Sequence, residues 1–240
     1  MVTRPNSQYA VRSQTGAAEL DVGLRSYMLK VYNYMAAGLA LTGLTAYGVF
    51  ASAETHPAII ETVMNLRWII MLATIGMVFW LSFGIRRMSA GTAQMSFWAY
   101  AILNGLWLMP IFLIYTQTSI ARAFFVAAAT FAGMSLYGYT TKRDLTGMGS
   151  FLFMGLIGLI VASLVNIFLA SSALTFAISA IGVLVFTGLT AYDSQKIKEM
   201  YFAGDSGEIM GKKAVMGALQ LYLDFINLFI MLLQFFGNRR

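Results

Sequence analysis

Long apolar runs separated by short polar segments dominate the pattern of this chain. Apolar residues predominate in the ranges 31–53, 68–85, 96–115, 123–140 and 215–236, and no residue from Phe151 to Tyr192 is charged. About 20 apolar residues in a helix cross a bilayer, because each backbone polar group is then paired within the segment. The run 151–192 is about twice that length, so it predicts two helices that turn at Ser171–Ser172. The pattern therefore predicts seven transmembrane helices.

The composition agrees with a protein whose main solvent is lipid. Of its 240 residues 59% are hydrophobic and 11% are charged, whereas about a quarter of the residues of a soluble domain are charged. There is no cysteine and one histidine, which excludes disulfides, thiolate metal sites and most histidine chemistry. We therefore expect an all-α integral membrane protein without a cofactor. Residues 1–24 are expected to form a polar tail and residues 25–240 a single transmembrane domain.

The positions of the basic residues predict an orientation. With the N-terminus inside, twelve of the 16 Lys and Arg residues lie in the tail and the inner loops, and four lie outside. Basic residues concentrate on the cytoplasmic side, so a cytoplasmic N-terminus is expected. The net charge of +6 then reflects orientation and contact with anionic lipid, and no nucleic acid partner is expected. After seven crossings Arg239 and Arg240 would lie outside. The alternative is a re-entrant last segment, which keeps both termini inside.

The last apolar segment carries a stripe of polar residues. Gln220, Asp224, Asn227 and Gln234 follow one another at intervals of four, three and seven, which places them on one face of a helix. Since the rest of its perimeter is apolar, this helix is expected at the centre of the bundle, with its stripe facing a polar path. The alternative is that the stripe only joins neighbouring helices by hydrogen bonds, although a carboxylate at membrane depth is costly.

Asp193, at the inner end of the sixth span, is the second carboxylate near the membrane. It shares a drifting helix face with Thr187 and Thr190. We expect Asp193 and Asp224 to approach each other. Two carboxylates in a low-dielectric site cannot both ionise cheaply, so the pair is expected to share a proton that it loses near neutral pH. The ionised pair suits transient binding of Ca²⁺. The alternative for Asp193 is a solvated charge paired with a lysine of the following turn.

Arg86 and Arg87 close the second span at its inner end. They are either ordinary cytoplasmic anchors, or one of them reaches the Asp193 region and latches the inner mouth through a charge-assisted hydrogen bond. Elsewhere, the pairs Gly38…Gly43 and Gly155…Gly158 predict close contacts between helices.

Four segments of the chain resemble the bacterial members of the Bax inhibitor-1 family. These segments are VYNYM at 31–35, KRDLTGMGS at 142–150, AYDSQKIK at 191–198 and the highly specific LYLDFINLF at 221–229. The resemblance implies seven helices with the last one central, a place in the inner membrane, and a pH-sensitive Ca²⁺ leak governed by Asp193 and Asp224. It also implies a latch arginine, for which Arg86 is the better match and Arg87 the second. Some bacterial members are linked to restraint of a membrane protease.

Three functions compete on this basis. The favoured function is a pH-sensitive cation leak, with the bilayer, protons and Ca²⁺ as partners and with no enzymatic activity. An intramembrane aspartyl protease would also need two aspartates on adjacent helices, but Asp224 follows Leu-Tyr-Leu instead of Gly-x-Gly, and no His-Glu-x-x-His motif is present. The third function is that of a non-transporting modulator, which binds other membrane proteins such as a membrane protease.

Overall fold

Nine helices make up the described part of the protein. The computed structural model describes the backbone of residues 7–52 and 55–240, and the side chains of residues 22–52 and 55–240. The helices are α1 (Ser7–Ala51), α2 (Pro57–Asn65), α3 (Arg67–Gly84), α4 (Ala90–Leu108), α5 (Ile111–Ile114), α6 (Gln117–Thr140), α7 (Thr146–Leu169), α8 (Ser172–Glu199) and α9 (Gly207–Phe236). Seven of them, all except the short α2 and α5, are long and apolar enough to cross a membrane, as the sequence predicts.

The sharp turn between α7 and α8 shows how the sequence divides its longest apolar run. Ala170 ends α7 in the left-handed region, with φ of 47°. Asn166 stabilises this turn, because its side-chain oxygen accepts a hydrogen bond from the backbone N–H of Ser171 and its amide donates to Thr175. The Ser171 hydroxyl then caps the first turn of α8 by accepting from the N–H of Leu174. The predicted turn at Ser171–Ser172 is confirmed.

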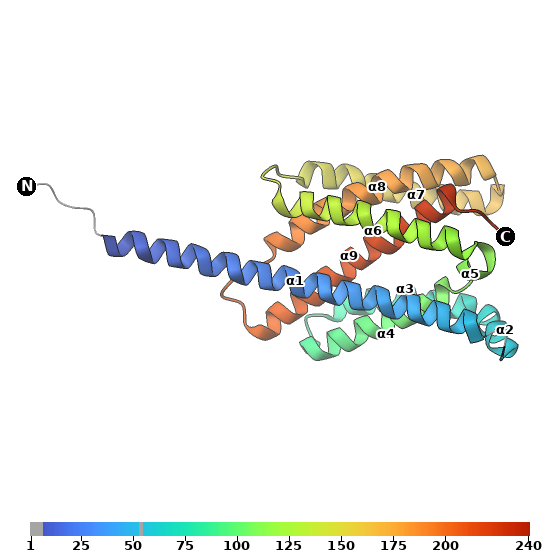
Figure 1. The fold of residues 1–240 in the computed structure, drawn as a ribbon, viewed down its shortest axis with the longest axis horizontal. Helices are drawn as coiled ribbons and strands as arrows, with labels where there is room; N and C mark the ends of the chain where they lie inside the picture. Colours follow the sequence, from blue (N-terminus) through green and yellow to red (C-terminus); the bar gives the residue numbers. More distant parts are fainter. Residues whose placement is uncertain (1–6, 53–54) are drawn as a thin grey trace, which may run out of the picture.

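Helix α9 is the most buried of the seven long helices. In its most apolar stretch 67% of the residues are buried, against 11 to 39% in the other six. It packs directly against α1, α4, α6 and α8, whereas α3 lies outside α4 and α7 lies outside α8. Figure 1 shows α9 passing through the bundle between α1 on one side and α6 and α8 on the other. Large apolar side chains such as Phe83 and Phe168 point outward from α3 and α7, as expected where the surrounding solvent is hydrocarbon.

The two ends of the bundle are defined by contacts between distant segments. At the end where α1 enters, here called the N-terminal face, Tyr27 packs against Tyr201 and the Glu208 carboxylate accepts a hydrogen bond from the N–H of Ala90. At the opposite, C-terminal face, the backbone of residues 238–240 is hydrogen-bonded to residues 114–119. The chain therefore crosses from one face to the other seven times, and the alternative of a re-entrant last segment is wrong. Helix α1 begins at Ser7 and projects beyond the bundle (Figure 1), so the predicted polar tail is helical from that residue on; its residues 1–6 lie outside the described residues.

Candidate functional site

The two predicted aspartates meet between α8 and α9. Asp193 comes from the last two turns of α8, and Asp224 comes from the middle of α9. Both are buried, with 6% and 5% of their surfaces exposed. Both carboxyl groups line one cavity, and they are close enough for the charge of one to act on the other. Two carboxyl groups form a hydrogen bond only when one of them carries a proton, so this arrangement suits a pair that holds a single shared proton.

One oxygen of this pair is left without a partner. Oδ2 of Asp224 is buried and accepts no hydrogen bond from any side chain or backbone group that the structure describes. Buried polar atoms almost always have a partner, and an unpaired acceptor in an apolar surrounding costs free energy. An acceptor in this position suits the proton that the two aspartates are expected to share.

A cavity of about 570 Å³, with mostly apolar walls and a few polar side chains, contains the pair. Its walls come from α7, α8 and α9, and its lining residues are Gly149, Ser150, Phe153, Leu156, Phe186, Leu189, Tyr192, Asp193, Gln220, Leu223, Asp224 and Asn227. Two members of the predicted stripe, Gln220 and Asn227, thus share the cavity with both aspartates. The Asn227 amide nitrogen donates a hydrogen bond to the carbonyl of Leu223 on its own helix, and this bond does not involve the Asn227 side-chain oxygen.

The threonines grouped with Asp193 by sequence spacing do not line this cavity. Residues at i, i+3 and i+6 drift by about 120° around a helix of 3.6 residues per turn, so Thr187 lies far from the direction in which Asp193 points. Residues at i, i+3 and i+7 return to almost the same direction, and Phe186 and Leu189 are the side chains of α8 that line the cavity with Asp193. Thr190 is buried elsewhere and donates to the carbonyl of Phe186.

The polar stripe of α9 is interrupted before its last member. Gln234 accepts a hydrogen bond from Ser179 of α8 at 3.2 Å and does not line the cavity. Met231 stands between Asn227 and Gln234 on the same face of α9. It packs so closely against Gly182 that a Cβ on that glycine would lie 2.6 Å from its sulfur. An apolar contact therefore separates the cavity from the C-terminal face.

Neither nearby lysine neutralises Asp193. Lys196 is paired with Glu199 at 3.0 Å, and the ammonium group of Lys198 donates to the carbonyl of Tyr139 at 2.7 Å. Among the side chains that the structure describes, Asp193 forms no ion pair. The alternative in which this aspartate is a lysine-paired surface charge is wrong, because the two lysines point to other partners and Asp193 faces the interior.

The two candidate latch residues lie apart from the pair. Arg86 and Arg87 are exposed in the turn between α3 and α4, while the cavity is bounded by α7, α8 and α9. The three ion pairs among the described side chains involve Lys196, Lys212 and Lys213, and none involves either arginine. In this conformation the structure does not bring the arginines and the aspartates together.

The loop between α6 and α7 is fixed beside the site. The side-chain amide of Gln195 donates to the carbonyl of Arg143 and its oxygen accepts from the N–H of Leu145, both at 2.8 Å. In the same loop, hydrogen bonds from Thr146 and, more weakly, the charge of Lys196 lower the pKa of the exposed Asp144 carboxyl. Asp144 is thus held in its ionised form over the range in which the buried pair is expected to exchange a proton.

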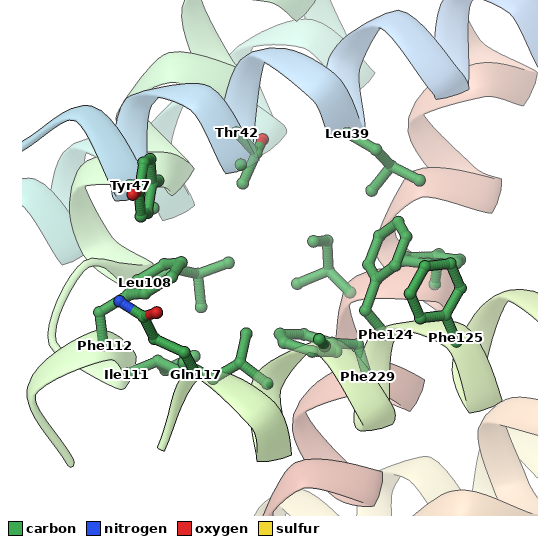
Figure 2. A pocket seen from close by; sticks show the side chains of 16 residues that line it. Leu39, Thr42, Tyr47, Leu108, Ile111, Phe112, Gln117, Phe124, Phe125 and Phe229 are labelled. Atoms are coloured by element: carbon green, nitrogen blue, oxygen red, sulfur yellow. The ribbon is translucent and has the colours of Figure 1, made fainter. Parts of the chain in front are cut away.

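A second polar cluster, on another side of α9, was not predicted. The amide of Asn104 donates to the Tyr222 hydroxyl at 2.8 Å, this hydroxyl is bonded to Thr42, and Thr42 donates to the carbonyl of Ala101. The sequence signal was present, since Thr42 and Asn104 are polar residues within apolar spans. Thr42 also borders an apolar cavity of about 330 Å³ between α1, α5, α6 and α9 (Figure 2), which contains none of the predicted site residues.

The donor set limits what the acidic pair can hold. Within the described residues, no group of three or more His, Cys, Asp or Glu side chains comes together as a metal site. Two carboxylates and the amide oxygens of Gln220 and Asn227 are oxygen donors of the kind that Ca²⁺ accepts, but Ca²⁺ takes six to eight oxygens at full coordination. The arrangement fits a cation that is held briefly and keeps part of its hydration shell, and it does not fit a permanently bound metal.

Comparison with known proteins gives matches over nearly the whole chain. The family profile described as "Inhibitor of apoptosis-promoting Bax1" matches residues 24–240. An uncharacterized protein of Rickettsia prowazekii is 54% identical over 220 residues, which cover 92% of both chains. The inner membrane protein YbhL of Escherichia coli is 50% identical over 220 residues, which cover 91% of this chain and 94% of YbhL. An uncharacterized membrane protein of Streptococcus pyogenes is 39% identical over 219 residues, which cover 91% of this chain and 95% of that protein.

Proposed function

This chain belongs to the Bax inhibitor-1 family, and on that premise we propose that it is a pH-sensitive leak for Ca²⁺ and other cations in a bacterial inner membrane. The observation that supports this most directly is the pair of Asp193 and Asp224, which are both buried and line one cavity. A carboxylate at membrane depth is costly to keep, and joining two helices by hydrogen bonds needs only amides and hydroxyls. A pair of carboxyl groups is the arrangement expected where protons and cations compete for one site.

The proposed mechanism is an exchange of one proton for one cation. With a shared proton the pair is held together by its own hydrogen bond and carries little charge, so it offers a cation little attraction. When the proton leaves, the two carboxylates repel each other and the oxygens turn toward the cavity, where Gln220 and Asn227 add amide oxygens. The cation is the transported species and needs no resident cofactor. The leak is therefore expected to be closed at acid pH and open at alkaline pH.

The orientation of the protein follows from its charges in this proposal. The N-terminal face carries the loops with most of the basic residues, and four basic residues lie toward the C-terminal face. The positive-inside rule then places the N-terminal face in the cytoplasm. Asp193 lies about 9 Å from the end of α8 at that face, counted by helical rise. The pair would thus exchange protons with the cytoplasm and report cytoplasmic pH.

The arginine latch belongs to a different conformation in this proposal. Because Arg86 and Arg87 are exposed in the turn after α3, one of them reaches Asp193 only if that turn moves toward α8. A latch of this kind would hold the closed state. A comparison of Arg86→Gln with Arg87→Gln in the Ca²⁺ flux assay described below shows which arginine is the latch.

Ca²⁺ flux into proteoliposomes, measured against pH, tests the proposed function. Asn has the shape of a protonated Asp, so Asp193→Asn and Asp224→Asn should each lower the flux above neutral pH by about tenfold, as expected when one of two attracting charges is removed at a poorly solvated site. Both variants should also lose the rise in flux with pH. Asp144→Asn is the matched control, because it removes an exposed carboxylate of the α6–α7 loop, and it should keep the wild-type profile. Flux and pH profile that stay unchanged in both cavity variants would refute the mechanism.

A further inference from the structure

A groove between α1 and α6 lies apart from the cavity that holds the acidic pair. Near the N-terminal face it opens into a cavity of about 760 Å³ that is lined by these two helices. The backbones of α1 and α6 do not pack closely, although both contact α9. A chain of hydroxyl hydrogen bonds joins them, from Tyr32 of α1 through Ser135 of α6 to Ser194 of α8, at 2.7 and 2.8 Å.

The groove opens toward lipid. Leu29 on one wall and Leu136 on the other are 52% and 62% exposed, and the small side chains of Ala36 and Ala132, which face the cavity, are exposed as well. Helices α1 and α6 are both membrane-spanning by length and composition. An occupant of this groove therefore enters from the hydrocarbon of the bilayer.

The charged residue of the lining stands at one end of the groove. Arg25 lines the mouth at the N-terminal face, the hydroxyls of Tyr32 and Ser135 lie about two helical turns deeper, and Met35 and Phe131 lie deeper still. From Arg25 to Ala36 the helical rise amounts to about 16 Å, which is about half of the ~30 Å hydrocarbon core. The charged group thus stands at the mouth, Met35 and Phe131 stand deepest, and the two hydroxyls lie between them beside apolar Met28 and Leu29. A phospholipid with its phosphate at the mouth and an acyl chain inside suits this lining.

A second cation strengthens the positive charge at the mouth. Tyr139 closes the mouth on the α6 side, and the ammonium group of Lys198 lies 5.4 Å from the centre of its ring and donates to its backbone carbonyl. Basic side chains near a membrane surface attract anionic headgroups by about 1 kcal/mol each. The charge at this mouth therefore selects an anionic headgroup over a zwitterionic one.

We propose that the α1–α6 groove is a binding site for one anionic phospholipid of the leaflet at the N-terminal face. Its phosphate lies at Arg25, its glycerol region lies beside the linked hydroxyls of Tyr32 and Ser135, and one acyl chain lies between Met35 and Phe131. The same two helices also line the apolar cavity of Figure 2, which begins at Leu39, one turn beyond Ala36, and reaches α9. The site shares no residue with the acidic cavity, so it stands independently of the proposed leak.

Native mass spectrometry of the full-length protein in detergent tests this site. Delipidated protein is mixed with phosphatidylglycerol or with phosphatidylcholine of the same acyl chains, and the fraction of protein with one bound lipid is measured. Wild type should bind phosphatidylglycerol at least about fivefold more tightly, which corresponds to roughly 1 kcal/mol. Arg25→Gln should lose this preference. Ala132→Trp, which fills the groove, should weaken the binding of both lipids.

Two matched variants control for general effects of charge and bulk. Arg122→Gln removes an exposed charge at the other end of α6, and Ala73→Trp adds the same bulk to an exposed position of α3 that borders no described cavity; both should bind lipid as wild type does. Equal binding of the two lipids by wild type, or an unchanged preference in Arg25→Gln, would overturn the proposal. Displacement of the lipid by glycerol 3-phosphate would also overturn the proposal, since the acyl chain would then contribute nothing to binding. A dimer of the protein in place of the lipid complex would overturn it as well.

Discussion

At the scale of single residues, the hydroxyl group of Tyr222 joins three helices. It accepts a hydrogen bond from the Asn104 amide of α4 and donates to the Thr42 hydroxyl of α1 at 2.5 Å, because the Thr42 hydrogen is engaged by the carbonyl of Ala101. The ring is fully buried and packs edge-on against Phe97 and Tyr100. A buried polar network stabilises a fold only while each of its members keeps a partner.

The substitution Tyr222→Phe should therefore destabilise the protein although it creates almost no cavity. The change leaves the Asn104 amide and one lone pair of Thr42 buried without a partner, at a cost of about 1–3 kcal/mol in the free energy of unfolding. Denaturant-induced unfolding in detergent measures this cost. Tyr137→Phe is the matched control, because Tyr137 is an exposed tyrosine of α6, and it should unfold like wild type. If both variants unfold alike, the network contributes nothing measurable to stability.

The residues of the candidate site differ in how far the sequence alone reveals them. Asp224 is conspicuous because the cost of a carboxylate in hydrocarbon is a property of that residue type and its depth. The Thr42–Tyr222–Asn104 cluster is not conspicuous in the sequence, because hydroxyl and amide groups at membrane depth have many local partners. Their actual partners depend on how three helices cross. The grouping of Thr187 with Asp193 failed for a simpler reason, since a spacing of three residues loses its common direction over two turns.

At the scale of the helices, the polar stripe of α9 is closed by one apolar side chain. Gln220, Asp224, Asn227, Met231 and Gln234 follow the four-three spacing of a single helix face. Met231 fills the space that Gly182 of α8 leaves open. In a leak that passes along this face, the Met231–Gly182 contact is the barrier between the cavity and the C-terminal face.

Shortening this side chain should accelerate the proposed leak. Met231→Ala removes the apolar plug without changing any charge, and about a tenfold faster Ca²⁺ flux is expected, which corresponds to a barrier lower by about 1.4 kcal/mol. Proteoliposome flux above neutral pH measures the change. Met154→Ala is the control, because Met154 is an exposed methionine of α7, and its flux should equal that of wild type. A Met231→Ala flux no faster than the Met154→Ala flux would place the barrier elsewhere.

The helices themselves could largely be predicted, because the length of an apolar run is set by the thickness of the bilayer. The contacts between them could be predicted only in part. Of the glycines expected at close contacts, Gly38 and Gly155 meet Phe97 and Val185, whereas Gly43 and Gly158 have nothing within 4 Å of an added Cβ. The closest approach to another helix's backbone is at Gly138, where a Cβ would overlap the backbone of Ala191. Which glycine forms a close contact depends on how two helices cross, and the sequence of one helix does not determine that crossing.

At the scale of the whole molecule, the two faces of the bundle differ in charge and in construction. The N-terminal face has the α6–α7 and α8–α9 loops, with ion pairs such as that between Lys213 and Asp205. The C-terminal face is closed by the end of the chain, where Arg239 forms a β-bridge with Tyr115 and the N–H of Arg240 donates to Ile114. In a membrane, the orientation of these faces decides which compartment the acidic pair reports on.

Cysteine labelling tests the proposed orientation, because the chain has no cysteine of its own. A cysteine added after Arg240 should react with a membrane-impermeant maleimide on intact spheroplasts. Ala203→Cys, in the exposed α8–α9 loop, should react only after the membrane is permeabilised. The reverse result would show that the N-terminal face lies outside, and labelling of both positions from the same side would contradict seven crossings.

The central place of α9 also has a consequence for biosynthesis. A ribosome releases this helix after the six others, so they enter the membrane before the helix that they pack around exists. Until α9 arrives, Asn104 of α4 and Asp193 of α8 have no access to their partners Tyr222 and Asp224. The order of synthesis thus postpones formation of the acidic pair, and of any conducting path built on it, until the rest of the bundle is already in the bilayer. A chain cut short before α9 would leave an incomplete bundle that lacks the pair.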